Sequence, residues 1–126
     1  MLDGAHNPAA AIRLAQTWRE QFGTRKATVI LALMRDKDAD GVAAALAPCM
    51  ARGLAVAARN PRAHSAESLC AIVANHAPCE AMPSLAAALE RAREFPEPIL
   101  IAGSLYLVGE ALALLHGDEP PEPSWQ

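Results

Sequence analysis

Hydrophobic positions along this chain follow two alternating patterns. In the segment 8–22 apolar residues recur at helical spacing, as Leu14, Trp18 and Phe22 do, which predicts a helix with one buried face. The segment 27–33 is a continuous run of residues that favour strands, which is typical of a strand buried on both faces of a sheet. The two patterns alternate along the chain and predict strands that are each followed by a helix.

The predicted elements are a strand stub at 1–2, a helix over 8–22 ended by Gly23, a strand over 27–33, a short helix over 40–49, a strand over 54–58, a polar loop over 59–64, a helix capped by Ser65, a weak strand over 80–82, a helix from Ser84 to about 93, a strand over 99–102 and a last helix from Ser104 to Gly117. Such alternation is typical of parallel strands with right-handed crossovers. The expected fold class is α/β, with three α/β/α layers around a mostly parallel, Rossmann-like sheet.

Ligands of such sheets lie beyond the carboxyl ends of the strands. The loops at 34–38 and 103–104 and the opening loop each join a strand to a helix, so the three share one rim. The opening loop reads Leu2-Asp3-Gly4-Ala5-His6-Asn7-Pro8. Asn7 and Pro8 suit the cap and the first position of a helix. Because a helix N-terminus favours anions, Asp3 and His6 there indicate nucleotide or phosphate chemistry.

Composition excludes several classes. The 126 residues suffice for one domain with a real core, and the net charge of −3 without a basic cluster argues against a nucleic-acid partner. No apolar run is long enough to span a membrane and no signal peptide is evident, which favours a cytoplasmic protein without a membrane partner. The three cysteines lack paired spacing and are expected to be reduced core thiols.

Several other side chains have two interpretations each. Lys37, between two aspartates, can reach a phosphate or belong to a solvated loop. Arg62 can bind a carboxylate, although a surface turn is the more common role. Ser104 can cap its helix and also bind an anion, whereas Tyr106 is expected to pack. The chain has no phosphate loop, no dinucleotide fingerprint and no acid cluster for magnesium, and no metal ligands are predicted among its histidines, His6, His64, His76 and His116.

Four segments together resemble one family, the C-terminal domain of folylpolyglutamate synthases and bifunctional dihydrofolate/folylpolyglutamate synthases, which are relatives of the Mur ligases. The opening loop is similar to the family's signature, and Ile101-Ala102-Gly103-Ser104-Leu105-Tyr106-Leu107-Val108-Gly109-Glu110 is similar to its last strand, turn and helix. Weaker matches are Met34-Arg35-Asp36-Lys37-Asp38 and Asn60-Pro61-Arg62-Ala63. The four matches follow the family's order along nearly the whole chain.

The resemblance implies an ATP-dependent ligase that adds L-glutamate to dihydropteroate or to folylpolyglutamate through an acyl phosphate. It implies that Asp3, His6 and Asn7 bind ATP, that His6 is catalytic, and that Ser104 and His6 bind glutamate. ATP, Mg²⁺ and the folate substrate are held mainly by an N-terminal domain, so this domain alone is expected to be inactive. The expected boundaries are a domain over 1–117 and a flexible acidic, proline-rich tail over 118–126. The very short first strand favours a fragment of a longer chain.

Three alternatives remain open at this point. One is a ligase of peptidoglycan precursor synthesis, which has the same fold and chemistry and a different amino acid. Another is a non-catalytic α/β domain that binds a small molecule. The third is a receiver-like regulatory domain, which requires an acid at the end of the third strand, where the segment 54–59 has none.

Overall fold

The strand β2 (Ala27–Ala32) forms the centre of the sheet and is buried along its whole length. Val29 and Leu31 point into one hydrophobic core, whereas Ile30 and Ala32 point into a second core on the other face. The continuous run of strand-forming residues is therefore explained by a strand that is covered on both sides. The computed structural model describes residues 1–116; the predicted stop at Gly117 and the predicted tail over 118–126 lie outside this range.

Five parallel strands make up the sheet, in the order β1-β5-β2-β3-β4. The other strands are β1 (Leu2–Asp3), β3 (Met50–Ala55), β4 (Cys79–Ala81) and β5 (Ile99–Gly103). The helices are α1 (Pro8–Phe22), α2 (Ala39–Leu46), the 3₁₀ turn η1 (Ala47–Cys49), α3 (Ala66–Val73), α4 (Leu85–Ala92) and α5 (Leu105–His116). Each strand is followed by a helix, as the alternating pattern predicted.

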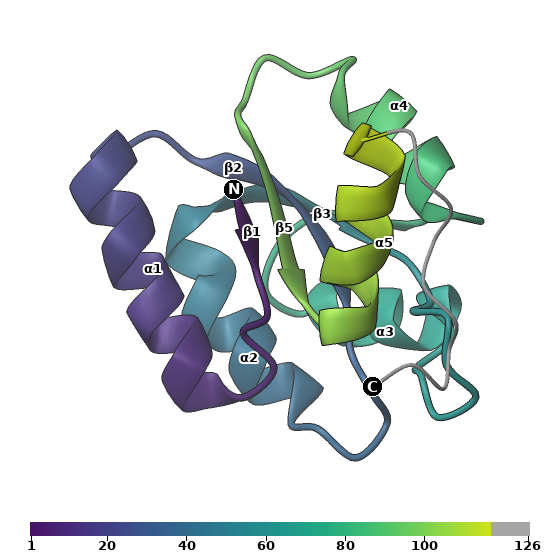
Figure 1. The fold of residues 1–126 in the computed structure, drawn as a ribbon. Coiled ribbons are helices and arrows are strands. Elements are labelled where there is room, and N and C mark those ends of the chain that lie inside the picture. Colours follow the sequence, from purple (N-terminus) through teal and green to yellow (C-terminus); the bar gives the residue numbers. More distant parts are fainter. Residues whose placement is uncertain (117–126) are drawn as a thin grey trace.

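The helices divide between the two faces of the sheet (Figure 1). Side chains of α1, α2 and α3, including Trp18, Leu46 and Leu69, share one core with the sheet. Side chains of α4 and α5, including Leu89 and Leu107, share the other. The predicted three-layer α/β/α class is thereby confirmed.

Short polar side chains set the starts of four helices. Asn7, Asp38, Ser65 and Ser84 each accept a hydrogen bond from the backbone N–H three residues further along the chain. Each bond satisfies one of the free donors in the first helical turn. The caps predicted at Asn7, Ser65 and Ser84 are confirmed.

The third strand is present, but its predicted bounds of 54–58 were wrong, because β3 begins at Met50 and ends at Ala55. Arg52 interrupts the apolar pattern there, yet it lies within the strand, where its guanidinium stacks on Phe95 and pairs with Glu97. The predicted helix over 40–49 was also too long. Pro48 lacks the N–H that would continue α2, and the chain tightens into η1 instead.

Candidate active site

The order of the strands creates a crevice at the carboxyl end of β5. The strand β5 lies between β1 and β2, and the helix that follows it covers the opposite face from α1 and α2 (Figure 1). The loop after β5 therefore leaves the sheet in one direction, while the loops after its two neighbours leave in the other. Ligand sites in open α/β sheets form where neighbouring loops diverge in this way.

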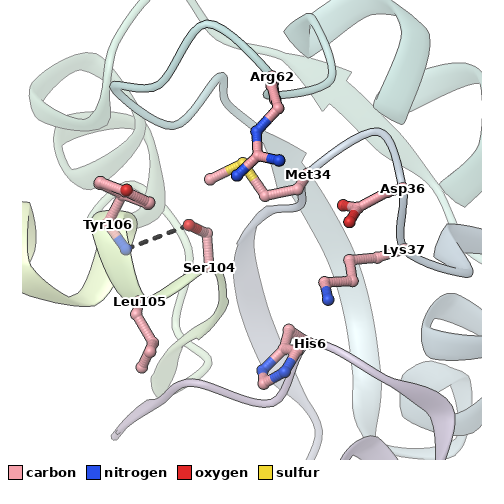
Figure 2. A pocket seen from close by; sticks show the side chains of 8 residues that line it. All are labelled: His6, Met34, Asp36, Lys37, Arg62, Ser104, Leu105 and Tyr106. Carbon is pink, nitrogen blue, oxygen red and sulfur yellow. Dashed lines mark hydrogen bonds between the residues drawn. The ribbon is translucent and has the colours of Figure 1, made fainter. Parts of the chain in front are cut away.

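A cavity of about 200 Å³ occupies this position. The loops after β1, β2, β3 and β5 line it with His6, Met34, Asp36, Lys37, Arg62, Ser104, Leu105 and Tyr106 (Figure 2). Complete sites for drug-sized ligands usually enclose about 300–1,000 Å³. The cavity therefore suits one charged end of a larger ligand.

The wall formed by β5 is fixed by its backbone. Gly103 has a φ of 109°, and a Cβ atom there would lie 2.1 Å from the carbonyl oxygen of Ala32, so only glycine fits. Ser104, which follows, donates its N–H to the same carbonyl and is only 4% exposed. Its Oγ accepts from the N–H of Tyr106 at 3.1 Å and caps α5 (Figure 2). The Ser104 hydroxyl is thus held at the cavity by the start of a helix.

The loop after β1 orients His6. Its Nδ1 lies 2.8 Å from the carbonyl oxygen of Gly4, and this pairing requires a proton on Nδ1. In the neutral ring Nε2 is then an acceptor, and in the protonated ring it is a second donor. A Cβ atom at Gly4 would lie 2.5 Å from the end of the Leu105 side chain, which would have to shift.

The loops after β2 and β3 are joined to each other. Met34 and Ala63 form an isolated antiparallel bridge, and the N–H of Arg35 donates to the carbonyl of Arg62 at 2.8 Å. The guanidinium of Arg35 donates to the carbonyl of Pro61 at 3.2 Å. These contacts hold Arg62 at the cavity, across from Lys37 and His6 (Figure 2).

The cavity is richer in positive than in negative groups. Lys37 and Arg62 face it together with one carboxylate, Asp36 (Figure 2). Within residues 1–116, neither Lys37 nor Arg62 lies within ion-pair distance of a carboxylate. Two cations, a histidine and a buried hydroxyl are suited to an oxyanion, such as a carboxylate or a phosphate.

The predicted site residues are not all in the cavity lining. His6 and Ser104 line it, and the three rim segments meet there as expected. Asp3 lies at the end of β1, in register with Ala102, and is half-buried. Asn7 is exposed and its side chain caps α1. The roles of these four residues toward ligands stay predictions.

Two further side chains of the cavity lining, Arg62 and Tyr106, were not among the predicted site residues. Arg62 is exposed and lies in the turn at 60–63, which confirms the predicted surface turn, and it lines the cavity as well. Tyr106 does pack against the second core, but it also lines the cavity. The signal for Arg62 was its place after a strand of the same parallel sheet, which brings its loop to the same rim.

The described part of the chain contains no group of three or more histidine, cysteine, aspartate or glutamate side chains that could hold a metal ion. His76 instead contacts Asp40 at 2.8 Å, and His64 lies 3.4 Å from the hydroxyl of Ser68. The three cysteines are free thiols, and burial raises the pKa of Cys79 to about 12. None of the helices within residues 1–116 is long and apolar enough to cross a membrane.

These observations define the class of protein: an α/β domain with a predominantly positive cavity where the loops after neighbouring strands diverge. Residues 1–105 match the family described as Mur ligase, glutamate ligase domain, and the chain belongs to that family. The resemblance inferred from the opening loop and the last strand–turn–helix is confirmed.

Two curated relatives are folate ligases. The dihydrofolate synthase/folylpolyglutamate synthase of Mycobacterium tuberculosis is 41% identical over 68 residues, which cover 54% of this chain and 14% of the relative. The probable bifunctional folylpolyglutamate synthase/dihydropteroate synthase of Haloferax volcanii is 35% identical over 116 residues, which cover 88% of this chain and 14% of the relative. The chain therefore spans a small part of the length of these relatives.

Solved structures of folylpolyglutamate synthases have the same fold. That of the Mycobacterium tuberculosis enzyme complexed with ADP has a TM-score of 0.82 and 28% identity, over 94% of this chain and 30% of that chain. The bifunctional enzyme of Yersinia pestis complexed with AMPPNP and Mn ion has a TM-score of 0.77 and 26% identity, over 91% of this chain and 28% of that chain. Nucleotide and metal are thus bound by members of the family.

Proposed function

We propose that this chain is the C-terminal domain of an ADP-forming ligase that adds L-glutamate to dihydropteroate, to folylpolyglutamate, or to both, in the cytoplasm. The single observation that carries the proposal is the cavity at the switch point, where His6, Ser104, Lys37 and Arg62 converge in a domain of the glutamate ligase family. The named relatives supply the folate class of substrate.

In this proposal Asp3, His6 and Asn7 contact ATP. A carboxylate offers paired acceptors for the hydroxyls of a ribose, which is the role of Asp3. His6, with Nδ1 bonded to Gly4, turns Nε2 toward the phosphate that is transferred or toward the incoming glutamate. Asn7 contributes through the N-terminus of α1 that it caps, because free N–H groups there attract phosphate.

Ser104 and the two cations bind glutamate in this proposal. A bidentate guanidinium suits a carboxylate, so Arg62 takes a carboxylate of glutamate and Lys37 adds a point charge beside it. The Ser104 hydroxyl accepts from the N–H of Tyr106 and keeps its own proton to donate to the substrate. Domain closure would bring these groups to the acyl phosphate held by the rest of the ligase.

The proposal assigns Mg²⁺ to the rest of the ligase. No metal-binding cluster lies within residues 1–116, so these residues do not fit a resident metal and contribute no ligand set to it. The domain's own contribution is to bind and orient the nucleotide and the amino acid. It follows that the isolated chain neither hydrolyses ATP nor forms an amide bond.

Nuclear magnetic resonance titrations of the chain test the proposal. We expect ADP to shift the backbone signals of residues 3–8, and L-glutamate to shift those of Arg62 and Ser104. His6→Ala should weaken the response to both ligands, while an Arg13→Ala control on the exposed face of α1 leaves it unchanged. Responses confined to residues outside the cavity, or none at all, would contradict the proposal.

Activity is tested in a hybrid enzyme, in which this chain replaces the matching domain of the Mycobacterium tuberculosis synthase. Glutamate-dependent release of ADP by the hybrid enzyme supports the assigned function. The same hybrid with Ser104→Ala should show a raised Michaelis constant for glutamate, and with His6→Ala a lower turnover. Release of ADP with another amino acid and not with glutamate would instead favour the ligases of peptidoglycan precursors.

A further inference from the structure

The turn that carries Arg62 has its own internal bonds. The N–H of Ala63 donates to the carbonyl of Asn60 at 3.0 Å, and the N–H of Arg62 donates to the Asn60 Oδ1 at 2.9 Å. These bonds set the shape of the turn at 60–63. They do not set where the turn lies relative to the cavity, because both partners belong to the turn itself.

Contacts with the loop after β2 fix that position. The N–H of Arg35 donates to the carbonyl of Arg62, and the N–H of His64 donates to the carbonyl of Leu33 at 2.9 Å. Both are backbone bonds on one side of the turn, next to the bridge between Met34 and Ala63. Any residue except proline at position 35 would retain them.

The tip of the turn, at Pro61, is held by a side chain instead of by backbone bonds. Pro61 has no N–H to give, and its carbonyl accepts from the guanidinium of Arg35 at 3.2 Å. Arg35 is exposed and does not line the cavity. Its side chain therefore contacts the turn next to Arg62 without being placed to contact a ligand in the cavity.

We infer that Arg35 is a positioning residue, whose guanidinium fixes the tip of the turn at 60–63 so that Arg62 is presented to an oxyanion in the cavity. This inference rests on the proposed function of the cavity. A turn that must be ordered on binding costs affinity, whereas a turn that is already held does not. Arg35 thus strengthens binding through Arg62 rather than through its own charge.

A double-mutant cycle on the 126-residue chain tests the inference. L-Glutamate and inorganic phosphate are titrated separately, so that carboxylate and phosphate binding are distinguished. We expect Arg35→Ala to weaken binding by about three- to tenfold, and to have no further effect in a chain that already carries Arg62→Ala. An equal loss in both backgrounds would show that Arg35 acts directly through its charge and would overturn the inference.

Amide hydrogen exchange without ligand separates this inference from the proposed function. In Arg35→Ala the N–H groups of Arg62 and Ala63 should exchange several-fold faster, with the amides of β2 unchanged and with no such effect in Arg13→Ala. Unchanged exchange at Arg62 and Ala63 would overturn the inference even if ligands bind. Faster exchange in a chain that binds neither probe would support the held turn and count against the proposed function alone.

Discussion

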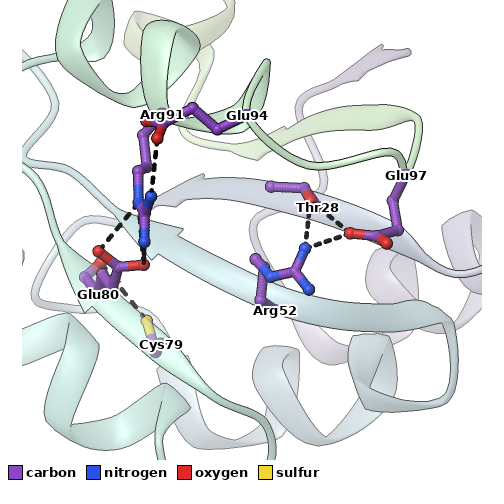
Figure 3. A network of polar contacts seen from close by, with 7 residues as sticks. All are labelled: Thr28, Arg52, Cys79, Glu80, Arg91, Glu94 and Glu97. Atoms are coloured by element: carbon purple, nitrogen blue, oxygen red, sulfur yellow. Dashed lines mark hydrogen bonds and ion pairs between the residues drawn. The ribbon is translucent and has the colours of Figure 1, made fainter.

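Positively charged side chains at the two ends of the sheet differ in whether they have acidic partners. At the carboxyl end, Lys37 and Arg62 face a cavity without a carboxylate in ion-pair distance among the described residues. Away from the cavity, Arg52 and Arg91 stack on Phe95, with their guanidinium carbons 3.7 and 4.7 Å from the ring centre. Both arginines there also have acidic partners (Figure 3).

Arg52 and Arg91, together with their acidic partners, form what we call the paired group, and this group joins several elements of the domain. Arg52 reaches Glu97 and lies 3.4 Å from the hydroxyl of Thr28, which joins β3 and β2 to the segment before β5. Arg91 joins α4 to β4 through Glu80 at 3.0 Å. Cations with acidic partners therefore join elements of the domain, whereas Lys37 and Arg62 have no such partner among residues 1–116.

The largest effect on the free energy of unfolding is expected at Gly103, where the cavity wall depends on the close approach of two backbone segments. Gly103→Ala would place a Cβ atom 2.1 Å from a backbone oxygen at a φ of 109°. We expect a loss of about 3 kcal/mol in the free energy of unfolding, measured in urea. Gly23→Ala is the matched control, because its φ is also positive, at 62°, and nothing lies within 4 Å of the added Cβ. Equal losses in the two variants would show that strain in φ explains both and that the close approach adds nothing.

The paired group provides the next prediction. Arg52→Ala removes the ion pair to Glu97 and the stacking on Phe95, and it leaves a half-buried carboxylate without this partner. We expect the free energy of unfolding to fall by about 2 kcal/mol. Arg13→Ala, an exposed arginine on α1, should change it by less than about 0.5 kcal/mol. If both substitutions had the same small effect, the paired group would not fasten the strands.

Substitution of the cavity cations, Lys37 and Arg62, should affect ligand binding and leave stability almost unchanged. We expect Lys37→Ala and Arg62→Ala to leave the free energy of unfolding within about 0.5 kcal/mol of the original. Each should weaken the binding of L-glutamate or phosphate by about tenfold, since hydrogen bonds to charged groups contribute about 1.5 kcal/mol or more. Urea unfolding and titration of the same samples check both halves. A loss of stability like that of Arg52→Ala would mean that these cations are structural.

The smallest effect is expected at Glu110 on α5. Burial raises the pKa of Glu110, and the charge of nearby Arg59 only partly opposes this. The folded state therefore holds the proton more tightly than the unfolded state, so this group's stabilisation is present at low pH and is lost as pH rises through the two pKa values. Glu110→Gln should flatten that part of the pH dependence of unfolding. A steeper decline in the variant would contradict the assigned cause.

Patterns in the sequence predicted what depends on local chemistry. The caps at Asn7, Ser65 and Ser84 follow from side chains that bond to their own helix, and the buried strand β2 follows from its apolar run. The parallel alternation then predicted that His6 and Ser104 share a rim, because strands of one direction end at one edge.

The start of β3 depended on partners distant in the sequence. Arg52 belongs in a strand because Phe95 and Glu97, more than forty positions later, cover and neutralise it. The place of Arg62 had a similar cause, since Arg35 and Met34 hold its turn from another loop. Local patterns carry no information about such pairs, so they predicted neither the start of β3 nor the place of the Arg62 turn at the cavity.

The insertion of β5 between β1 and β2 has a consequence for how the domain is made. The strands β2, β3 and β4 are neighbours in the sequence as well as in the sheet, so they can pair while the chain is still being synthesised. The crevice requires Ile101 beside both Leu2 and Ile30, and its two sides cannot meet until that late segment has left the ribosome. Until then the loops after β1 and β2 lack the wall that Ser104 and Tyr106 provide, so the cavity forms only after β5 and the start of α5 have been synthesised.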